Sequence, residues 1–261
     1  MEPIEKEQTN ASLFVKIGII VLSTIMIIGF GIRILPDAIT VSNISSKRDL
    51  PIYHVNCEEK KVALSFDTGW GNDDTQIILD ILAKNDVKAT FFMTGEWINK
   101  YPDDVKSIAE AGHDLGNHSE NHKQMSQLSP EECVKEIMIA HNRVQELTGI
   151  DMNLFRPPYG DYNNTLVGMA RDCGYYTIQW DIDSLDWKDY GPESIVNKTV
   201  NNKKLGNGSI ILMHNGAKFT PEALESVILG LKDKGYEIVP ISMLIYTGEY
   251  TIDHTGRQLA K

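Results

Sequence analysis

The chain has 261 residues, of which 42% are hydrophobic and 23% are charged, so it is long enough to bury one full-sized core. Its formal net charge of -11 makes it acidic, which excludes a protein that displaces counterions from nucleic-acid phosphates through a basic face. We expect one catalytic domain in a monomeric protein with no nucleic-acid partner.

The first predicted element is an apolar run over residues 17–32, which lies between Lys16 and Arg33 and contains no charged residue. About 20 mostly apolar residues span a bilayer, and flanking basic side chains can reach the head groups. We therefore predict a cytoplasmic segment over 1–10 and a transmembrane anchor over 11–35, with a cleaved signal peptide as the alternative. Basic residues on both sides of the run leave its orientation open.

Two segments without regular periodicity flank the predicted domain. Residues 36–59 are mixed and polar, which predicts a linker between the anchor and a domain over 60–248. Residues 249–261 are predicted to form a C-terminal tail.

Strand-like and helical segments alternate from residue 60 onward, which implies an α/β fold with a parallel sheet. Right-handed crossovers would curl such a sheet into a distorted barrel of about seven strands. We prefer the barrel to an open doubly wound sheet because polar groups follow strands along the whole domain rather than at one switch point. The strands are predicted over 61–66, 88–94, 113–117, 153–156, 174–180, 208–213 and 236–240, and the helices over 73–85, 102–111, 129–148, 163–173, 192–204 and 221–234.

Capping signals accompany the predicted starts of two helices. Ser129 precedes Pro130 and two acidic residues, and Thr220 precedes Pro221 and another acidic residue. This pattern predicts that Ser129 and Thr220 are the N-caps of their helices.

A carboxylate ends the first predicted strand. Asp67 follows Ser65 and Phe66, and Gly69 then permits a sharp turn. A carboxylate at this position faces the mouth of a barrel and can act as a general base or a metal ligand. The alternative is a side chain that only stabilises the turn.

Two histidines four residues apart follow the third predicted strand. On a helical turn this spacing places the imidazoles of His118 and His122 on one side, where they can hold one divalent cation. Two solvated histidines in a polar loop are the alternative, but the position at a strand end favours a site.

Two further strand ends carry cationic or titratable side chains. Arg156 can clamp a carboxylate through a bidentate contact that keeps it ionised and oriented. His214 ends an apolar strand and suits a general acid whose pKa is raised by a nearby carboxylate, for which Asp183 and Asp186 are available.

Aromatic residues near these strand ends could bind a sugar. Trp187 offers a flat apolar wall, and Trp70, Trp97 and Tyr159 could extend it. Packing in the hydrophobic core is the alternative for each of them.

The segments SFDTG, HSENH, RPPYG, DSLDW and LMH, in this order over residues 61–244, resemble the five motifs of the NodB-like polysaccharide deacetylases, carbohydrate esterase family 4. The resemblance implies a distorted barrel that removes acetyl groups from N-acetylated sugars, such as those of peptidoglycan or chitin. It also implies a divalent metal, with zinc expected. The nearest resemblance is to membrane-anchored, sporulation-type deacetylases of Gram-positive bacteria, which implies a cell-wall substrate and a domain outside the membrane.

The resemblance also assigns roles to individual residues. It implies that Asp67 is the base, Arg156 positions it, His214 is the acid and Asp186 tunes His214. The metal ligands would be His118 and His122, the Tyr159 backbone N–H would bind the oxyanion, Leu212 and Trp187 would line the acetyl pocket and groove, and Trp70 would add to substrate binding.

One position departs from the family pattern. The first motif normally has two adjacent aspartates, the second of which completes an Asp-His-His metal site, whereas this chain has Thr68. A neutral hydroxyl binds a cation less strongly than a carboxylate, so metal affinity should fall unless Asp73 or Asp74 takes over. A catalytically impaired homologue that binds glycan is therefore the alternative function.

A metal-dependent barrel of the amidohydrolase kind is a further alternative. Such an enzyme would need a His-x-His pair at the end of the first strand. The chain has Ser65-Phe66-Asp67 there, which disfavours it.

Overall fold

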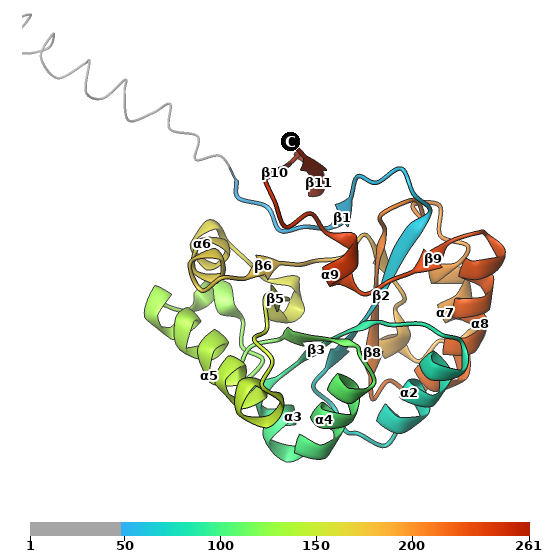
Figure 1. The fold of residues 1–261 in the computed structure, drawn as a ribbon, viewed down its shortest axis with the longest axis horizontal. Helices are drawn as coiled ribbons and strands as arrows, with labels where there is room; N and C mark the ends of the chain where they lie inside the picture. Colours follow the sequence, from blue (N-terminus) through green and yellow to red (C-terminus); the bar gives the residue numbers. More distant parts are fainter. Residues whose placement is uncertain (1–47) are drawn as a thin grey trace, which may run out of the picture. The chain divides into compact units, whose positions relative to one another are not determined.

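Strand β2 (Lys61–Thr68) lies at the centre of a curled parallel sheet, between β3 (Thr90–Met93) and β8 (Ile210–Asn215). The computed structural model describes residues 48–261. Asp49–Lys261 forms one compact unit, which Figure 1 shows as a sheet surrounded by helices.

The sheet has the strand order β6-β5-β4-β3-β2-β8-β7, and β9 also pairs with β2. All of these pairs are parallel. Between residues 48 and 261 no ladder joins β6 to β7, so the barrel is incompletely closed. The predicted distorted α/β barrel is thus confirmed, and its seven predicted strands all overlap observed ones. The remaining strands are β4 (Asp114–Asn117), β5 (Leu154–Phe155), β6 (Tyr176–Thr177), β7 (Ile182–Asp183) and β9 (Glu237–Ile238).

Helices cover the outside of the curled sheet (Figure 1). All six predicted helices are present within a few residues of their predicted bounds, whereas the short helices α3 and α9 were not predicted. The helices are α2 (Thr75–Lys84), α3 (Gly95–Lys100), α4 (Pro102–Glu110), α5 (Pro130–Thr148), α6 (Asn164–Asp172), α7 (Pro192–Thr199), α8 (Thr220–Asp233) and α9 (Ile241–Leu244), with single 3-10 turns at η1 (Met125–Gln127), η2 (Pro158–Gly160) and η3 (Asp186–Lys188).

Alternation along β2 divides its side chains between two environments. Val62, Leu64 and Phe66 belong to the main hydrophobic core, which the helices also line. Ser65 and Asp67 point to the opposite, inner face, because successive side chains of a strand point to opposite sides. The end of β2 therefore places polar side chains on the inner face, at the mouth of the barrel.

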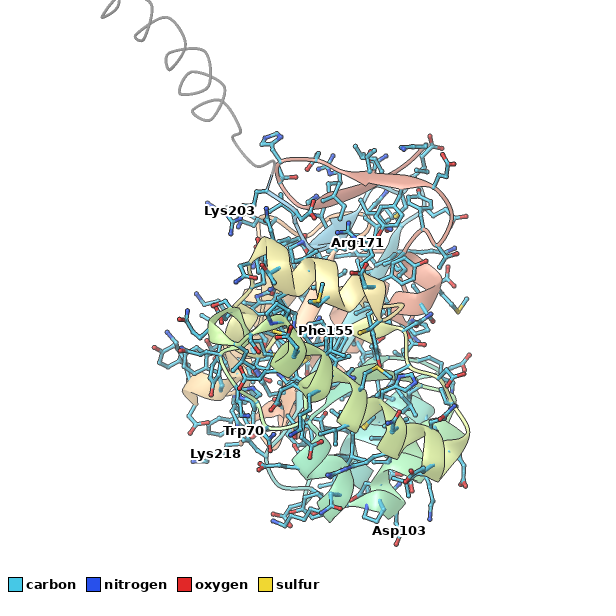
Figure 2. The ribbon with its side chains drawn as sticks, turned by 90° about the vertical axis from the view of Figure 1, so that its left-hand side faces the viewer. Trp70, Asp103, Phe155, Arg171, Lys203 and Lys218 are labelled. Atoms are coloured by element: carbon cyan, nitrogen blue, oxygen red, sulfur yellow. The ribbon has the colours of Figure 1, made fainter. Side chains whose placement is uncertain are left out.

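The core is continuous along the other strands and helices. Phe155 is fully buried, and Figure 2 places it in the interior of the side-chain layer, whereas Asp103 and Lys203 lie at its margins. Packing of this kind fixes the strands whose ends carry the site.

The compact unit is larger than the predicted domain at both ends. Strand β1 (His54–Val55) lies in the predicted linker, and the predicted tail forms β10 (Tyr250–Ile252) and β11 (Arg257–Ala260). β11 pairs with β1 in parallel and with β10 in antiparallel orientation. The pairing of β1 with β11 joins segments about 200 residues apart, which local periodicity does not reveal.

The two predicted N-caps have different outcomes. Ser129 forms a full capping box with Glu132, in which each side chain accepts a hydrogen bond from the other residue's backbone N–H. The prediction for Thr220 is wrong, because helix α8 begins at Thr220 itself and its N-cap residue is Phe219. The Thr220 hydroxyl instead donates to Asp186, at 2.7 Å.

The predicted anchor over 11–35 lies outside the residues that the structure describes. Within 48–261, no helix has the length and apolar character that crossing a membrane requires.

Candidate active site

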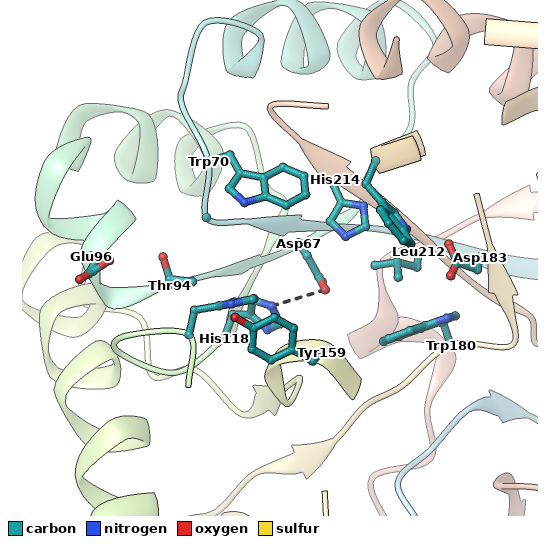
Figure 3. A pocket seen from close by; sticks show the side chains of 13 residues that line it. Asp67, Trp70, Thr94, Glu96, His118, Tyr159, Trp180, Asp183, Leu212 and His214 are labelled. Atoms are coloured by element: carbon teal, nitrogen blue, oxygen red, sulfur yellow. Dashed lines mark ion pairs between the residues drawn. The ribbon is translucent and has the colours of Figure 1, made fainter. Parts of the chain in front are cut away.

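A cavity of about 570 Å³ opens at the carboxyl ends of the strands (Figure 3). Strands β2, β7 and β8, and the segments that follow β3, β4, β5 and β6, each contribute to its walls, as expected for parallel strands that end at one edge. The lining residues are Asp67, Gly69, Trp70, Thr94, Glu96, His118, His122, Tyr159, Trp180, Asp183, Trp187, Leu212 and His214.

Asp67 lies on the inner face near the end of β2 and is almost fully buried. Its Oδ1 accepts a hydrogen bond from Nη1 of Arg156 at 2.7 Å, and its Oδ2 lies 3.5 Å from Nε2 of His118. Burial alone raises the pKa of Asp67, but the charge and hydrogen bond of Arg156, with further contributions from His118 and His214, outweigh burial and hold that pKa below its usual range. Asp67 is therefore an ionised carboxylate inside the cavity at neutral pH.

Arg156 lies behind Asp67 and is fully buried. Its guanidinium carbon lies 4.1 Å from the ring centroid of Phe92 and 5.6 Å from that of Trp180, so aromatic rings contact the guanidinium. Besides Asp67, the group donates through Nη2 to the hydroxyl of Ser65 and to the carbonyl of Gln179. The predicted contact between this arginine and a carboxylate is present, although a single nitrogen makes it.

His118 and His122 both reach the cavity, with their ring centroids 4.9 Å apart. The predicted helical turn between them is wrong, because residues 118–122 are not helical and His122 has a φ of 51°. Nδ1 of His118 lies 2.7 Å from the Arg156 carbonyl oxygen, which can only accept. Nδ1 therefore carries the proton, and the lone pair of the neutral ring is on Nε2, toward Asp67.

Burial keeps both histidines neutral. It lowers the pKa of His118 to about 4, against the opposing charge of Asp67, and it also lowers the pKa of His122. Neutral imidazoles are the form in which histidine binds a metal.

Helix α5 supports the loop that carries the histidines. Glu136 accepts hydrogen bonds from the backbone and side-chain amides of Asn121, both at 2.8 Å. Arg143 forms an ion pair with Glu120 at 2.8 Å and also donates to the carbonyl of Gly95. The loop is thus tied to α5 at two adjacent positions, Glu120 and Asn121, just before His122.

The residues present do not fit the three-ligand metal site that the resemblance implies. Thr68, the last residue of β2, is fully buried; its hydroxyl lies 3.5 Å from the Phe66 carbonyl, and Thr68 is not part of the cavity lining. Within residues 48–261, no three His, Cys, Asp or Glu side chains are grouped so that they could hold a metal ion. A catalytic zinc site normally has three protein ligands.

Neither neighbouring aspartate replaces the missing ligand. Asp74 accepts from Nδ2 of Asn215 at 2.6 Å and from the Gly216 N–H at 2.8 Å, so both of its oxygens serve the segment at the end of β8. Asp73 is exposed and is not part of the cavity lining.

His214 and Asp186 form a tightly bonded pair on the other side of the cavity. Nδ1 of His214 lies 2.7 Å from Oδ1 of Asp186, and the His214 backbone N–H donates to Oδ2, also at 2.7 Å. Burial lowers the pKa of His214, but the hydrogen bond and charge of Asp186, with a smaller contribution from Asp67, raise it above the ordinary value. Asp186 therefore favours the protonated form of His214.

Three exposed aromatic side chains, Trp70, Tyr159 and Trp187, stand at the cavity. Trp70 stacks on the ring of His214 with the centroids 5.2 Å apart, an arrangement that Figure 3 shows, and Tyr159 contacts the ring of His122. Leu212 also lines the cavity, and its assignment to an acetyl pocket stays a prediction. Trp97 is buried and donates to the Gly71 carbonyl, so it does not extend this surface.

Several residues at the site were not predicted from the sequence. Trp180 and Glu96 line the cavity, while Ser65 and Thr220 contact Arg156 and Asp186 from behind. Ser65 could have been found, because it lies two residues before Asp67 and therefore on the same face. Thr220 gives no such signal, since it lies 34 positions from Asp186.

The chain is similar in sequence to known polysaccharide deacetylases. A family described as polysaccharide deacetylase matches residues 54–178. The chain is 34% identical to the peptidoglycan-N-acetylglucosamine deacetylase PgdA of Listeria monocytogenes over 88% of its own length, and it spans only 47% of that relative. It is 31% identical to the peptidoglycan-N-acetylmuramic acid deacetylase PdaA of Bacillus subtilis, over 82% of each chain.

A solved structure with a similar fold is BA3943 of Bacillus anthracis, described as a pseudoenzyme of carbohydrate esterase family 4. It is 35% identical, with a TM-score of 0.71 over 74% of this chain and 68% of that one. A mutant of BA3943 with restored enzymatic activity matches equally well, at 36% identity.

Proposed function

The chain belongs to the polysaccharide deacetylase family, and we propose that it hydrolyses the acetamide of N-acetylated sugars in peptidoglycan. The observation that supports this proposal best is the pair of Asp67 and His214 in one cavity, with pKa values shifted in opposite directions. Environments that favour an ionised carboxylate and a protonated imidazole provide a base and an acid for one reaction.

In the proposed reaction, Asp67 accepts a proton from water as the water oxygen forms a bond to the acetyl carbonyl carbon. Arg156 keeps the Asp67 carboxylate ionised and oriented for this step. The Tyr159 backbone N–H is proposed to stabilise the oxyanion. Its support is the position of Tyr159 at the cavity with a φ of 60°, a left-handed conformation that is uncommon outside glycine.

His214 completes the reaction by giving its proton to the sugar nitrogen as the carbon–nitrogen bond breaks. Asp186 holds the imidazole through Nδ1, so Nε2 is the nitrogen that can deliver the proton. The products are acetate and a free amine, and the proton on Asp67 returns to solvent.

The proposed reaction contains no step at a metal ion. Deacetylases of this family are generally metal-dependent, but position 68 supplies no carboxylate to the cavity and only two imidazoles remain beside Asp67. We propose that the wild-type chain binds zinc weakly at most.

The aromatic cavity rim supports a glycan as the substrate. Trp70, Trp187 and Tyr159 offer flat apolar faces of the kind that sugar rings contact. Peptidoglycan is the proposed glycan because two relatives are named for deacetylating it.

We further propose that the protein is anchored in the cytoplasmic membrane by the apolar run over 17–32, with the domain outside, where peptidoglycan lies. The sporulation-type assignment stays a prediction of the sequence motifs. Fractionation and protease accessibility in intact cells would test the anchor and its orientation.

A catalytically impaired homologue that binds glycan is the second candidate function. It is favoured by Thr68 and by the likeness to BA3943, which is itself described as a pseudoenzyme. It explains less of the cavity, since a protein that only binds glycan needs neither a base nor an acid.

Acetate release from peptidoglycan and from N-acetylated chitin oligosaccharides, with a chelator and then with added divalent metals, tests the proposal. We expect acetate from wild type and a small change with chelator. Activity that is abolished by chelator and restored by zinc would replace the metal-free mechanism, and no acetate under any of these conditions would favour the impaired homologue.

A further inference from the structure

Ser65 and Asp67 are linked by the guanidinium of Arg156. Because they lie two residues apart on β2, their side chains share the inner face of the strand. Nη1 of Arg156 donates to Asp67 at 2.7 Å, and Nη2 donates to the hydroxyl oxygen of Ser65 at 2.9 Å. One planar group therefore spans two consecutive inward positions of the strand.

The hydroxyl of Ser65 has a fixed orientation. It donates its proton to the carbonyl oxygen of Ile211 on β8 at 2.8 Å. A hydroxyl has only one proton, so toward Arg156 it can act only as an acceptor. Ser65 is fully buried, which means that water does not compete for either bond.

The hydrogen bonds to Asp67 and Ser65 are the main contacts that set the orientation of the Arg156 guanidinium plane. The rings of Phe92 and Trp180 contact the guanidinium but provide no hydrogen-bond acceptor for it. The Gln179 carbonyl is a more distant acceptor of Nη2, at 3.2 Å, and Nε has no partner among the described residues. Ser65 is thus the nearest acceptor for Nη2, the guanidinium nitrogen that does not contact Asp67.

We propose that Ser65 is a positioning residue, whose hydroxyl holds the Arg156 guanidinium in the orientation that presents Nη1 to Asp67. Ser65 touches neither the cavity nor the substrate, so its effect passes through Arg156. The catalytic consequence of this inference rests on the proposed function, whereas the orientation of Arg156 can be measured independently of it.

For catalysis, we expect Ser65→Ala to lower kcat about 10-fold with little change in KM, because a hydrogen bond to a buried charged group is lost and the base is less well oriented. Ser65→Thr keeps the hydroxyl and should retain kcat within about 3-fold of wild type. A KM increase without a kcat decrease would point to substrate binding and overturn the proposed role.

Thr90→Val is the matched control. Thr90 is the partner of Ser65 in the register between β2 and β3 and is also fully buried. Its hydroxyl donates to Asp114 and accepts from the Ile241 N–H, away from Arg156. Thr90→Val should lower thermal stability and leave kcat unchanged. If it lowers kcat as much as Ser65→Ala, the effect comes from general destabilisation and the proposal fails.

The independent measurement is nitrogen NMR of the arginine side chains, with the Arg156 signals assigned by their loss in Arg156→Lys. We expect separate, slowly rotating Nη signals in wild type and Ser65→Thr, and averaged signals in Ser65→Ala. Unchanged Nη signals in Ser65→Ala would overturn the positioning role even in an active enzyme. Averaging in Ser65→Ala would support it even if wild type released no acetate, in which case only the proposed function would fail.

Discussion

Asp67 and His214 are directly opposite each other as partners in the parallel register of β2 and β8. Both line the same cavity. Because side chains alternate along a strand, a register shift of one residue would turn one of them toward the helices. The pairing of two strands is thus enough to bring the proposed base and acid together, without a flexible loop.

The environments of the two residues separate their protonation states. Arg156 stabilises the ionised form of Asp67, and Asp186 stabilises the protonated form of His214. Opposed environments of this kind indicate which member of a pair is base and which is acid.

Asp67→Asn should reduce acetate release by about 10²- to 10⁴-fold, because the amide cannot accept the proton. It should also lower the free energy of unfolding by about 3–5 kcal/mol, because fully buried Arg156 loses its counter-ion. Urea unfolding and an acetate assay on the same preparation measure both effects. Full activity, or unchanged stability, would contradict the assignment of this pair.

Asp186→Asn should lower the pKa of His214, because burial then acts without its main opposing contact. The acid must be protonated to act, so activity should be lost at a lower pH on the alkaline side than in wild type. The measurement is kcat/KM against pH. Asp183→Asn is the control, since Asp183 has a smaller effect on His214 than Asp186 has. Equal shifts in the two variants would show that the direct contact is not decisive.

Thr68→Asp should bind zinc more tightly than wild type, because it adds an anionic ligand near two neutral imidazoles. Without zinc it should be less stable, since a carboxylate at this fully buried position would add a negative charge next to Asp67 in the chain with no cation to compensate it. Calorimetric titration and thermal unfolding, each with and without zinc, measure the two effects. Tight binding by wild type would show that the site is assembled without position 68, and no binding by either protein would exclude the histidine pair as a metal site.

His113 should make stability depend on pH below neutrality. Burial, with a smaller effect of Lys88, lowers its pKa to about 4 from the ordinary 6.5. The unfolded chain therefore binds more protons than the native protein between these values, so stability should fall as the pH drops from 6.5 to 4. The contribution is at most about 1.4 kcal/mol per pH unit.

His113→Gln should flatten this dependence, because glutamine does not titrate. Its side-chain oxygen can still accept the Ala89 N–H that Nδ1 of His113 accepts. Urea unfolding across this pH range is the measurement, and an unchanged slope would contradict the assignment.

Local sequence patterns predicted most of the fold. Two examples are the apolar alternation of β2 and the capping signals at Ser129. Both depend only on residues close together in the chain, so they can be recognised without a structure. Strands β7, β10 and β11 were missed because they are short and are defined by their pairing partners. β11, for example, pairs with β1 some 200 residues earlier.

The candidate site was predictable to the level of which side chains meet, because parallel strands end at one edge. The contacts behind the cavity were not, since Thr220 and Asp186 lie 34 positions apart and on different elements. The loop conformation of His122, with its φ of 51°, could not have been inferred from local patterns either.

The most direct test of the central claim is a time course of acetate release from N-acetylated peptidoglycan by wild type and by Asp67→Asn, with new free amines counted and glycan binding measured in parallel. The account predicts equal amounts of acetate and free amine from wild type, at least about 100-fold slower release by Asp67→Asn, and glycan binding by both. Glycan binding by wild type without any release of acetate, whatever divalent metal is added, would contradict the account.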